Sequence, residues 1–244
     1  MNQDSARAWP NDVRVAVSLT YDGALPEHLD VVGPTLDHLR LTGTFFLNPT
    51  RTLENVQGWQ SMSDAGHEMA NGCLLGVSEE GRLTNWTHRM VEQDLHMTQE
   101  FFENVFGEPP VSFAYPGRFT NCSQGSYRPI VNAAFPYSRS AIPGDNRAGA
   151  NRRYLRVRDV AGRSQEELET WREALLAELA KTTSEKVWYV LQFGKIFDGE
   201  TNRALILHEL CATFLATQSE SVWVAPLKTV ADRFGVGSHL SISR

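Results

Sequence analysis

Leu19-Thr20-Tyr21-Asp22-Gly23-Ala24-Leu25 joins two sequence patterns from which the architecture of this chain can be inferred. An apolar run with valine at alternate positions leads into it and predicts a buried strand over 13–20. Apolar residues then recur every three or four positions after Pro26, which predicts a helix. Acidic side chains at the carboxyl end of a buried strand are where α/β barrels place their chemistry, so Asp22 is the first candidate for a functional residue.

Strand and helix patterns alternate along the rest of the chain. Short apolar runs predict further strands near 44–47, 66–70, 111–115, 137–141, 154–158, 187–191 and 222–225. Helical patterns lie between them, the longest over 85–106. The number of strands favours an α/β fold built as a distorted (β/α) barrel of seven to eight strands, with an open doubly wound sheet as the alternative. We expect one barrel domain over 13–238, an N-terminal extension over 1–12 and a C-terminal tail over 239–244.

The charge balance and the cysteine content exclude several classes of protein. The chain has 244 residues, with 23 Lys and Arg against 29 Asp and Glu, and its net charge of −6 argues against binding to nucleic acid or to anionic membranes. Three widely spaced cysteines, Cys73, Cys122 and Cys211, do not indicate a disulfide framework. No apolar run is as long as a membrane span, and the first seven residues lack the apolar segment of a signal peptide. We therefore expect a cytoplasmic protein.

Five segments resemble the polysaccharide deacetylases, carbohydrate esterase family 4, and they occur in the order of that family. Thr20-Tyr21-Asp22-Gly23-Ala24 resembles the TYDDG motif, and Gly43-Thr44-Phe45-Phe46 resembles the strand that follows it. Gly66-His67-Glu68-Met69-Ala70-Asn71 and Phe113-Ala114-Tyr115-Pro116-Gly117 resemble the GHEIGNH and RPPYG segments. Val222-Trp223-Val224-Ala225-Pro226-Leu227 resembles the closing strand. The resemblance implies a barrel that removes acetyl groups from N-acetylated sugars with the help of a divalent metal, usually zinc.

The residues that hold this metal in the family are not matched by metal-binding side chains. Carried over position by position, the general base falls on Asp22, and the three metal ligands fall on Gly23, Gly72 and Gly76. The late histidine that serves as general acid falls on Phe193. Zinc needs about three side-chain ligands, so the resemblance predicts no metal, no other cofactor and no metal-dependent deacetylation.

We expect a ligand pocket around the positions that the metal ligands have vacated. Its candidate residues are Tyr21, Asn71, Cys73, Tyr115, Arg118 and Phe193. A rebuilt metal site that uses Cys73 is the less favoured alternative, because a cysteine there is more often a small buried side chain. Asp22 has an equally weighted structural alternative, as a residue that caps the following turn. His67 is predicted to be a structural strand residue, and His208, in an apolar helical stretch, a helix-surface residue.

Three functions remain open from the sequence. The first is a deacetylase-like protein that has lost metal-dependent hydrolysis of C–N bonds and binds a carbohydrate or another small ligand, with a homo-oligomer as a further expectation. The second is a metal-independent amidohydrolase, allantoinase-like, acting on a small amide or cyclic ureide. The third is a non-catalytic module that binds another protein.

Overall fold

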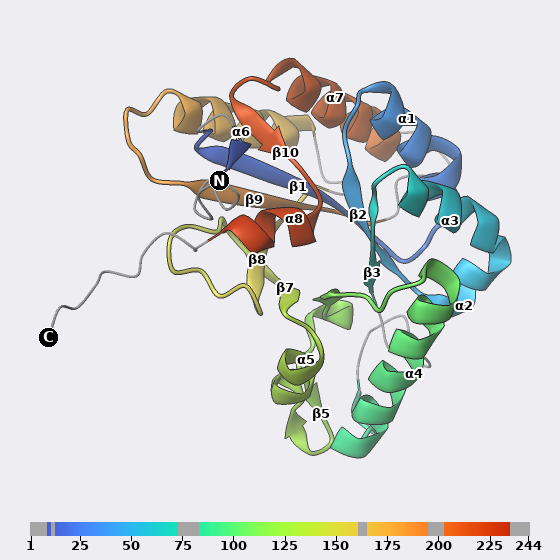
Figure 1. The fold of residues 1–244 in the computed structure, drawn as a ribbon. Coiled ribbons are helices and arrows are strands. Elements are labelled where there is room, and N and C mark those ends of the chain that lie inside the picture. The colour runs from blue at the N-terminus through green and yellow to red at the C-terminus, as the bar shows by residue number, and fades with distance from the viewer. Residues whose placement is uncertain (1–8, 11–12, 73–82, 161–164, 195–202, 235–244) are drawn as a thin grey trace, which may run out of the picture.

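Parallel strands close into a barrel in the computed structural model, which describes residues 9–10, 13–72, 83–160, 165–194 and 203–234 (Figure 1). Around the ring the strands are β1 (Val15–Asp22), β2 (Gly43–Leu47), β3 (Glu68–Asn71), β4 (Ser112–Ala114), β7 (Tyr137–Pro143), β8 (Leu155–Asp159) and β9 (Val187–Phe193). β9 pairs with β1 and completes the ring, and β10 (Val222–Val224) adds an extra strand beside β1. The predicted barrel is therefore confirmed, and the open sheet is excluded.

The first strand has three partners. Val15–Val17 pair with β10, and Leu19–Asp22 pair with β2. The whole length from Val15 to Tyr21 pairs with β9. β1 therefore lies at the centre of the pairing, and its last residue, Asp22, comes out at the carboxyl end of the barrel.

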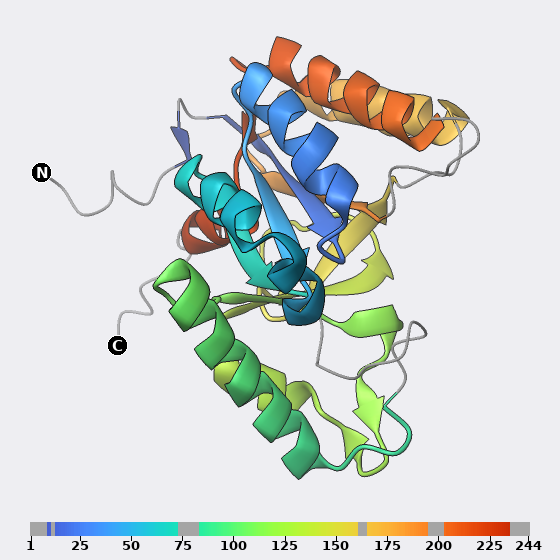
Figure 2. The same ribbon diagram turned by 90° about the vertical axis from the view of Figure 1, so that its right-hand side faces the viewer.

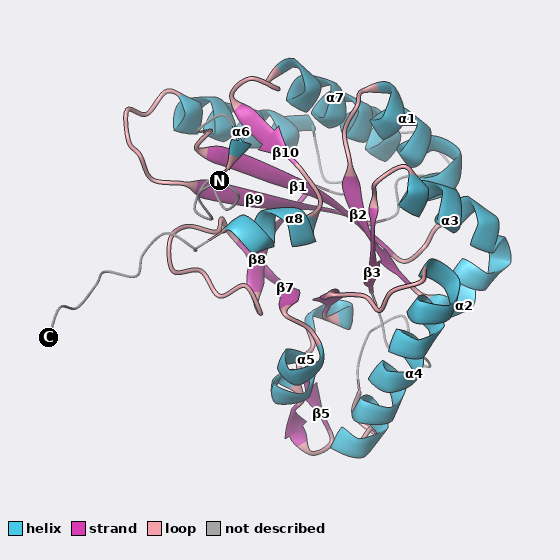
Figure 3. Ribbon diagram, viewed as in Figure 1, coloured by secondary structure: helices cyan, strands magenta, loops and turns pink. Residues whose placement is uncertain are grey.

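Helices surround the barrel on its outside and at one end (Figure 3). Those before β7 are η3 (His28–Val32), α1 (Gly33–His38), α2 (Pro49–Thr52), η4 (Leu53–Asn55), α3 (Val56–Asp64), α4 (His88–Phe106), η5 (Pro116–Arg118) and α5 (Arg128–Ala134). Those after it are α6 (Gln165–Leu179), α7 (Arg203–Thr217) and α8 (Leu227–Arg233). Figure 2 shows α6 and α7 side by side at one end of the molecule, with α4 at the other. None of the helices in the described ranges is long and apolar enough to cross a membrane.

The long helix α4 begins three residues later than predicted. Its N-cap is Thr87, whose side chain accepts a hydrogen bond from the backbone N–H of Met90, so the helix starts where an orphan N–H finds an acceptor. A small hairpin lies between η5 and α5 and is formed by β5 (Asn121–Cys122) and β6 (Gly125–Ser126).

Alternate residues of each strand face two different cores. Along β1, Val15, Val17, Leu19 and Tyr21 belong to the core between the barrel and helices such as α1, α3, α6 and α7. Ala16, one position out of step with them, belongs to a second core inside the ring. Since successive strand side chains point to opposite faces, Asp22 shares the inner face with Ala16.

The amino end of the barrel is closed by α8. Leu227 at its start is buried in the inner core, and its backbone N–H donates to Oγ1 of Thr44 over 2.8 Å. The backbone N–H of Lys228 and the hydroxyl of Thr44 donate to Oε2 of Glu68, and the hydroxyl of Ser112 donates to Oε1. Burial raises the pKa of Glu68, and these donors oppose the rise. The Glu68 carboxylate therefore connects α8 to β2 and β4 through hydrogen bonds.

His67 is a structural residue, as predicted. Its Nδ1 accepts from the backbone N–H of Gly43 over 3.1 Å, and its Nε2 lies 3.2 Å from a carboxylate oxygen of Asp37. Burial lowers the pKa of His67, with Asp37 opposing the effect. Both ring nitrogens are therefore occupied by the protein.

Candidate functional site

Asp22 reaches into the barrel and contacts a residue from the other side of the ring. Its Oδ1 accepts a hydrogen bond from Nη2 of Arg139, which lies on β7. Since β1 and β7 are not neighbours in the ring, this contact crosses the barrel interior. Oδ2 of Asp22 accepts a second hydrogen bond from Nε2 of Gln192 on β9, over 2.8 Å. The carboxylate is therefore held by donors from two other strands, while 31% of the Asp22 side chain stays exposed.

Arg139 is a buried cation. Only 3% of its side chain is exposed, and its guanidinium carbon lies 4.5 Å from the centre of the Phe46 ring. Burial lowers the pKa of Arg139 to about 9, and the nearby charge of Asp159 opposes that effect, so the side chain is charged at neutral pH. Its Nε–H is buried without a hydrogen-bond acceptor in the part of the chain that the structure describes.

Four strands bring this group together at the carboxyl end of the barrel. Asp159 on β8 pairs in register with Gln192 on β9, which in turn reaches Asp22 on β1. Arg139 on β7 completes this group of polar side chains. Arg51 lies next to the group, with its Nη1 3.4 Å from the carbonyl oxygen of Gly23. This is the end of the barrel where enzymes of such folds carry their active sites.

Two predicted pocket residues, Tyr21 and Phe193, lie on the opposite face of their strands. Their rings stack with centres 5.2 Å apart in the helix-facing core. The Tyr21 hydroxyl lies 2.8 Å from Nε2 of His208 on α7, and burial raises its pKa. Neighbouring residues of a strand face opposite sides of the sheet. Tyr21 precedes Asp22 and Phe193 follows Gln192, so both face the helices and not the barrel interior. The structure does not bring Tyr21 and Phe193 together with the Asp22 carboxylate.

Asn71 and Tyr115 also lie away from the barrel interior. Asn71 is fully buried and pairs in register with Leu47 and Phe113, two residues of the outer cores. Tyr115 follows β4 and contacts Phe113 and Tyr127 in the core under α4 and α5. Neither side chain meets Asp22 in the structure.

The remaining predicted pocket residues are only partly described. Cys73 lies outside the described residues, as does the glycine at position 76. Arg118 ends the short helix η5, and the placement of its side chain is outside the description. Their membership of a pocket stays a prediction.

His208 is not a surface residue, which corrects the sequence prediction. It is fully buried, because the outward face of α7 is formed by other residues and His208 turns toward the sheet. His28 from η3 is also buried and lies edge-on to the Tyr21 ring, with ring centres 5.7 Å apart. Burial lowers the pKa of each imidazole to about 4, and for His208 the proximity of His28 adds to the effect. Both are neutral at pH 7 and belong to the helix-facing core.

The described residues around Asp22 do not fit a zinc ion. Gly23 and Gly72 have no side chain to offer, and a guanidinium such as that of Arg139 has no lone pair for a metal. A Cβ at Gly72 would lie 2.3 Å from the carbonyl oxygen of Phe46, so this position has no room for a histidine. Within the described ranges, no three His, Cys, Asp or Glu side chains form a group that could hold a metal.

Arg139, Gln192 and Asp159 are the functional candidates that sequence reasoning missed. One signal was available for Arg139, which stands in an otherwise small and apolar strand where a charged side chain needs a partner. Nothing in the sequence indicates that the partner is Asp22, 117 positions earlier in the chain.

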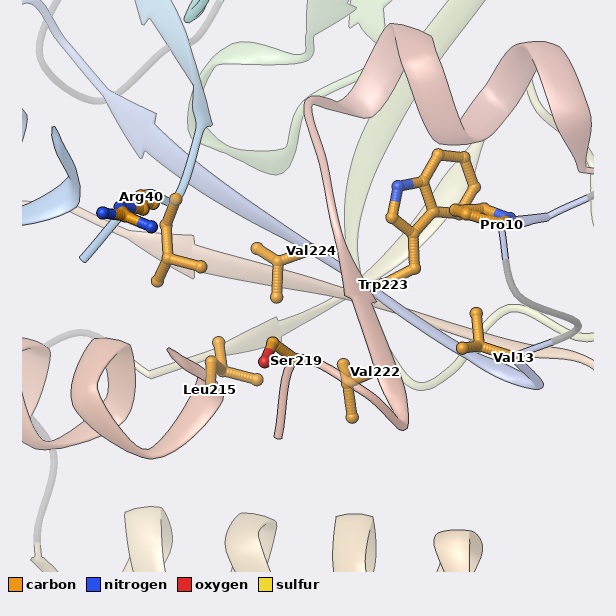
Figure 4. Close-up of a pocket in the computed structure, with 9 residues that line it drawn as sticks. Pro10, Val13, Arg40, Leu215, Ser219, Val222, Trp223 and Val224 are labelled. Carbon is orange, nitrogen blue, oxygen red and sulfur yellow. The ribbon is translucent and has the colours of Figure 1, made fainter. Parts of the chain in front are cut away.

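Two cavities lie away from this group. One, of about 190 Å³, opens beside β10 and is lined by Pro10, Val13, Arg40, Leu41, Leu215, Ser219, Val222, Trp223 and Val224 (Figure 4). Leu41 precedes β2 and Ser219 precedes β10, so this cavity is at the amino end of the barrel. The other, of about 170 Å³, lies between α6 and α7 beside Trp171 and Cys211.

Comparisons with known proteins found one family model that matches part of the chain, and solved structures with a similar fold. Residues 11–124 match the family model for polysaccharide deacetylase. A Mycobacterium smegmatis protein assigned to the polysaccharide deacetylases has 18% identity and a TM-score of 0.65, with 92% of this chain and 91% of that chain covered. The PuuE allantoinase has 14% identity and a TM-score of 0.68, with 93% and 92% covered.

A third structure is a mutant of a carbohydrate esterase family 4 pseudoenzyme, described as having restored enzymatic activity. It has 18% identity and a TM-score of 0.56, with 91% of this chain and 69% of that chain covered. No curated protein sequence matches this one closely enough to be counted as a relative.

Proposed function

We propose that this chain, whose residues 11–124 match the family model for polysaccharide deacetylase, binds a carbohydrate, or another ligand with hydroxyl and amide groups, without metal-dependent hydrolysis. The binding site is the carboxyl end of β1. The observation that carries the proposal is the double engagement of the Asp22 carboxylate by Arg139 and Gln192.

This engagement opposes the metal-dependent reaction in two ways. A carboxylate whose two oxygens accept from Arg139 and Gln192 is a poor ligand for a metal and a poor acceptor for a proton from water. Without a bound metal, water keeps a pKa near 15.7 instead of about 7, so hydroxide is scarce at neutral pH. The proposed role of Asp22 is therefore to bind a ligand.

The same group offers contacts to a neutral, oxygen-rich ligand. The buried Nε–H of Arg139 lacks an acceptor within the described residues, and buried donors are normally satisfied by protein, water or ligand oxygen. Asp22 is partly exposed and can accept from a hydroxyl or an amide. One protein with this fold is described as a pseudoenzyme whose activity a mutant restores, so the fold also occurs in a protein without that activity.

The test measures hydrolysis and binding separately. We expect no release of acetate from N-acetylchitopentaose, with or without added zinc, and saturable binding of the same sugar by calorimetry. Asp22→Asn should weaken binding at least about tenfold, roughly the worth of one hydrogen bond to a charged group, while Asp30→Asn, an exposed aspartate on η3, should not. Acetate release that zinc increases and a chelator abolishes would contradict the proposal.

A second candidate is a metal-independent amidohydrolase that acts on a small amide or cyclic ureide. Two features favour it: Asp22 stands where the family places its base, and the Arg139 Nε–H is a donor suited to the carbonyl oxygen of an amide. The fold is also similar to that of an allantoinase. Incubation with allantoin and hydantoin, followed by detection of ring-opened product, tests it. Turnover that is lost in Asp22→Asn and unaffected by chelators would favour this candidate over simple binding.

Two further predictions accompany the proposal. We expect the protein to be cytoplasmic, which cell fractionation tests. We also expect it to form a homo-oligomer, which light scattering after size-exclusion chromatography tests.

A further inference from the structure

We infer that Arg139 is the resident cation of this site, and that its guanidinium keeps free divalent ions away from Asp22 and Asp159. The inference rests on the proposed metal independence and deepens it by naming the residue responsible. It also makes a prediction that the proposed function does not make, namely that removal of this one side chain creates a cation site.

The charges in the group support this assignment. Asp22 and Asp159 bring two carboxylates to the carboxyl end of the barrel, and Arg139 is the cation that lies buried among them. Gln192, in register with Asp159 and hydrogen-bonded to Asp22, contributes a neutral amide whose carbonyl oxygen is a further donor atom. Removal of Arg139 makes the net charge of this group more negative by one.

The oxygen donors would suit a hard divalent ion once Arg139 is absent. Carboxylate and amide oxygens are the ligands that Mg²⁺, Mn²⁺ and Ca²⁺ prefer. In the native chain an ion at this place would have to displace the Arg139 contact to Asp22 and would lie beside a second cation. The Arg139 side chain cannot withdraw to water easily, because it is buried and stacked on the Phe46 ring.

The position of Arg139 also distinguishes it from an incidental surface ion pair. Surface pairs contribute little and exchange readily with solvent ions. Arg139 approaches Asp22 through the barrel interior from a strand that is not its neighbour. Its cationic group is therefore fixed by the closure of the ring, as a bound metal would be fixed by its ligands.

The experiment compares Mn²⁺ binding by the native chain and by variants without the cation. Arg139→Met removes the charge and keeps an unbranched side chain over Phe46, and Arg139→Gln keeps a donor for Asp22. We expect both variants to bind about one Mn²⁺ per chain by equilibrium dialysis, at least tenfold more than the native chain at the same free concentration. Mn²⁺ should also raise the melting temperature of the variants and leave that of the native chain unchanged.

Two controls identify the ligands. Arg139→Met combined with Asp22→Asn should lose the Mn²⁺ that the single variant gains. Arg152→Met changes another arginine, one whose Nη1 donates to the carbonyl oxygen of Ala231, and should gain none. These outcomes do not depend on sugar binding.

Three results would overturn the inference. The first is stoichiometric Mn²⁺ binding by the native chain, which would overturn the proposed metal independence as well. The second is a folded Arg139→Met or Arg139→Gln variant that takes up no Mn²⁺, which leaves the proposed function intact. The third is failure of both variants to fold even with Mn²⁺ present, because the ion should replace the missing cation.

Discussion

Replacing Gly72 with alanine should destabilise the protein strongly, although only one methyl group is added. A Cβ at this position would lie 2.3 Å from the carbonyl oxygen of Phe46, 2.5 Å from its carbonyl carbon and 2.8 Å from its Cβ. Real Cβ atoms essentially never approach other atoms within 3.0 Å. The obstacle is backbone of β2, so the end of β2 or of β3 must move by close to an ångström.

We expect the free energy of unfolding to fall by about 3 kcal/mol, at the upper end of the usual effect of overpacking, because no flexible side chain can yield. Urea denaturation followed by tryptophan fluorescence measures this as a lower midpoint at an unchanged slope. Gly194→Ala is the matched control, since a Cβ there meets no atom of the described residues within 4 Å, and it should change stability by less than about 0.5 kcal/mol. Equal stability of the two variants would refute the packing argument. If the argument holds, a histidine introduced at Gly72 cannot serve as a metal ligand.

Asp22→Asn should lower the free energy of unfolding by about 1–3 kcal/mol, because it leaves the buried Arg139 charge facing a neutral amide. The partial exposure of Asp22 moderates this loss. Urea titration at pH 7 measures the change in stability, and an unchanged midpoint would contradict the prediction. Acidification from pH 6.5 to 5 should destabilise the fold by up to about 2 kcal/mol for each of His28 and His208, because the unfolded chain takes up protons there while the folded chain, with both pKa values near 4, does not. Stability should therefore rise with pH through this window, and a flat profile would rule out two neutral buried imidazoles. Glu68→Gln should cost about 1–3 kcal/mol, because an amide N–H₂ must then face hydroxyl and backbone donors, whereas the same change at an exposed glutamate should be silent in the same titration.

The positions of the strands along the chain could be predicted from the sequence because each strand is a short apolar run bounded by turn residues. The match extends to the last strand, where Val222–Val224 lies beside β1. The boundaries of α4 were less accurate, since the choice among several polar residues for its N-cap depends on which side chain reaches an orphan N–H. Which residue caps the helix depends on the geometry of its first turn, and the sequence does not specify that geometry.

The candidate site was predicted in part. Asp22 was found because a carboxylate at a strand end is a local signal. Its partners Arg139 and Gln192 were not found, because they are joined to it by the closure of the ring and lie 117 and 170 positions away. Tyr21 and Phe193 were chosen for their closeness in sequence, and on a strand the nearest neighbour faces the other way.

The pairing of β1 with β9 has a consequence for how the protein is made. β1 is made before β9 and finds its full-length partner only when Val187–Phe193 has been synthesised, so the ring depends on contacts of very high sequence separation. Until then one edge of β1 offers free backbone N–H and C=O groups in an apolar strand, a template for association with other chains. Any fragment that stops before residue 187 keeps that edge open, and the barrel cannot be divided into an independently folding first half.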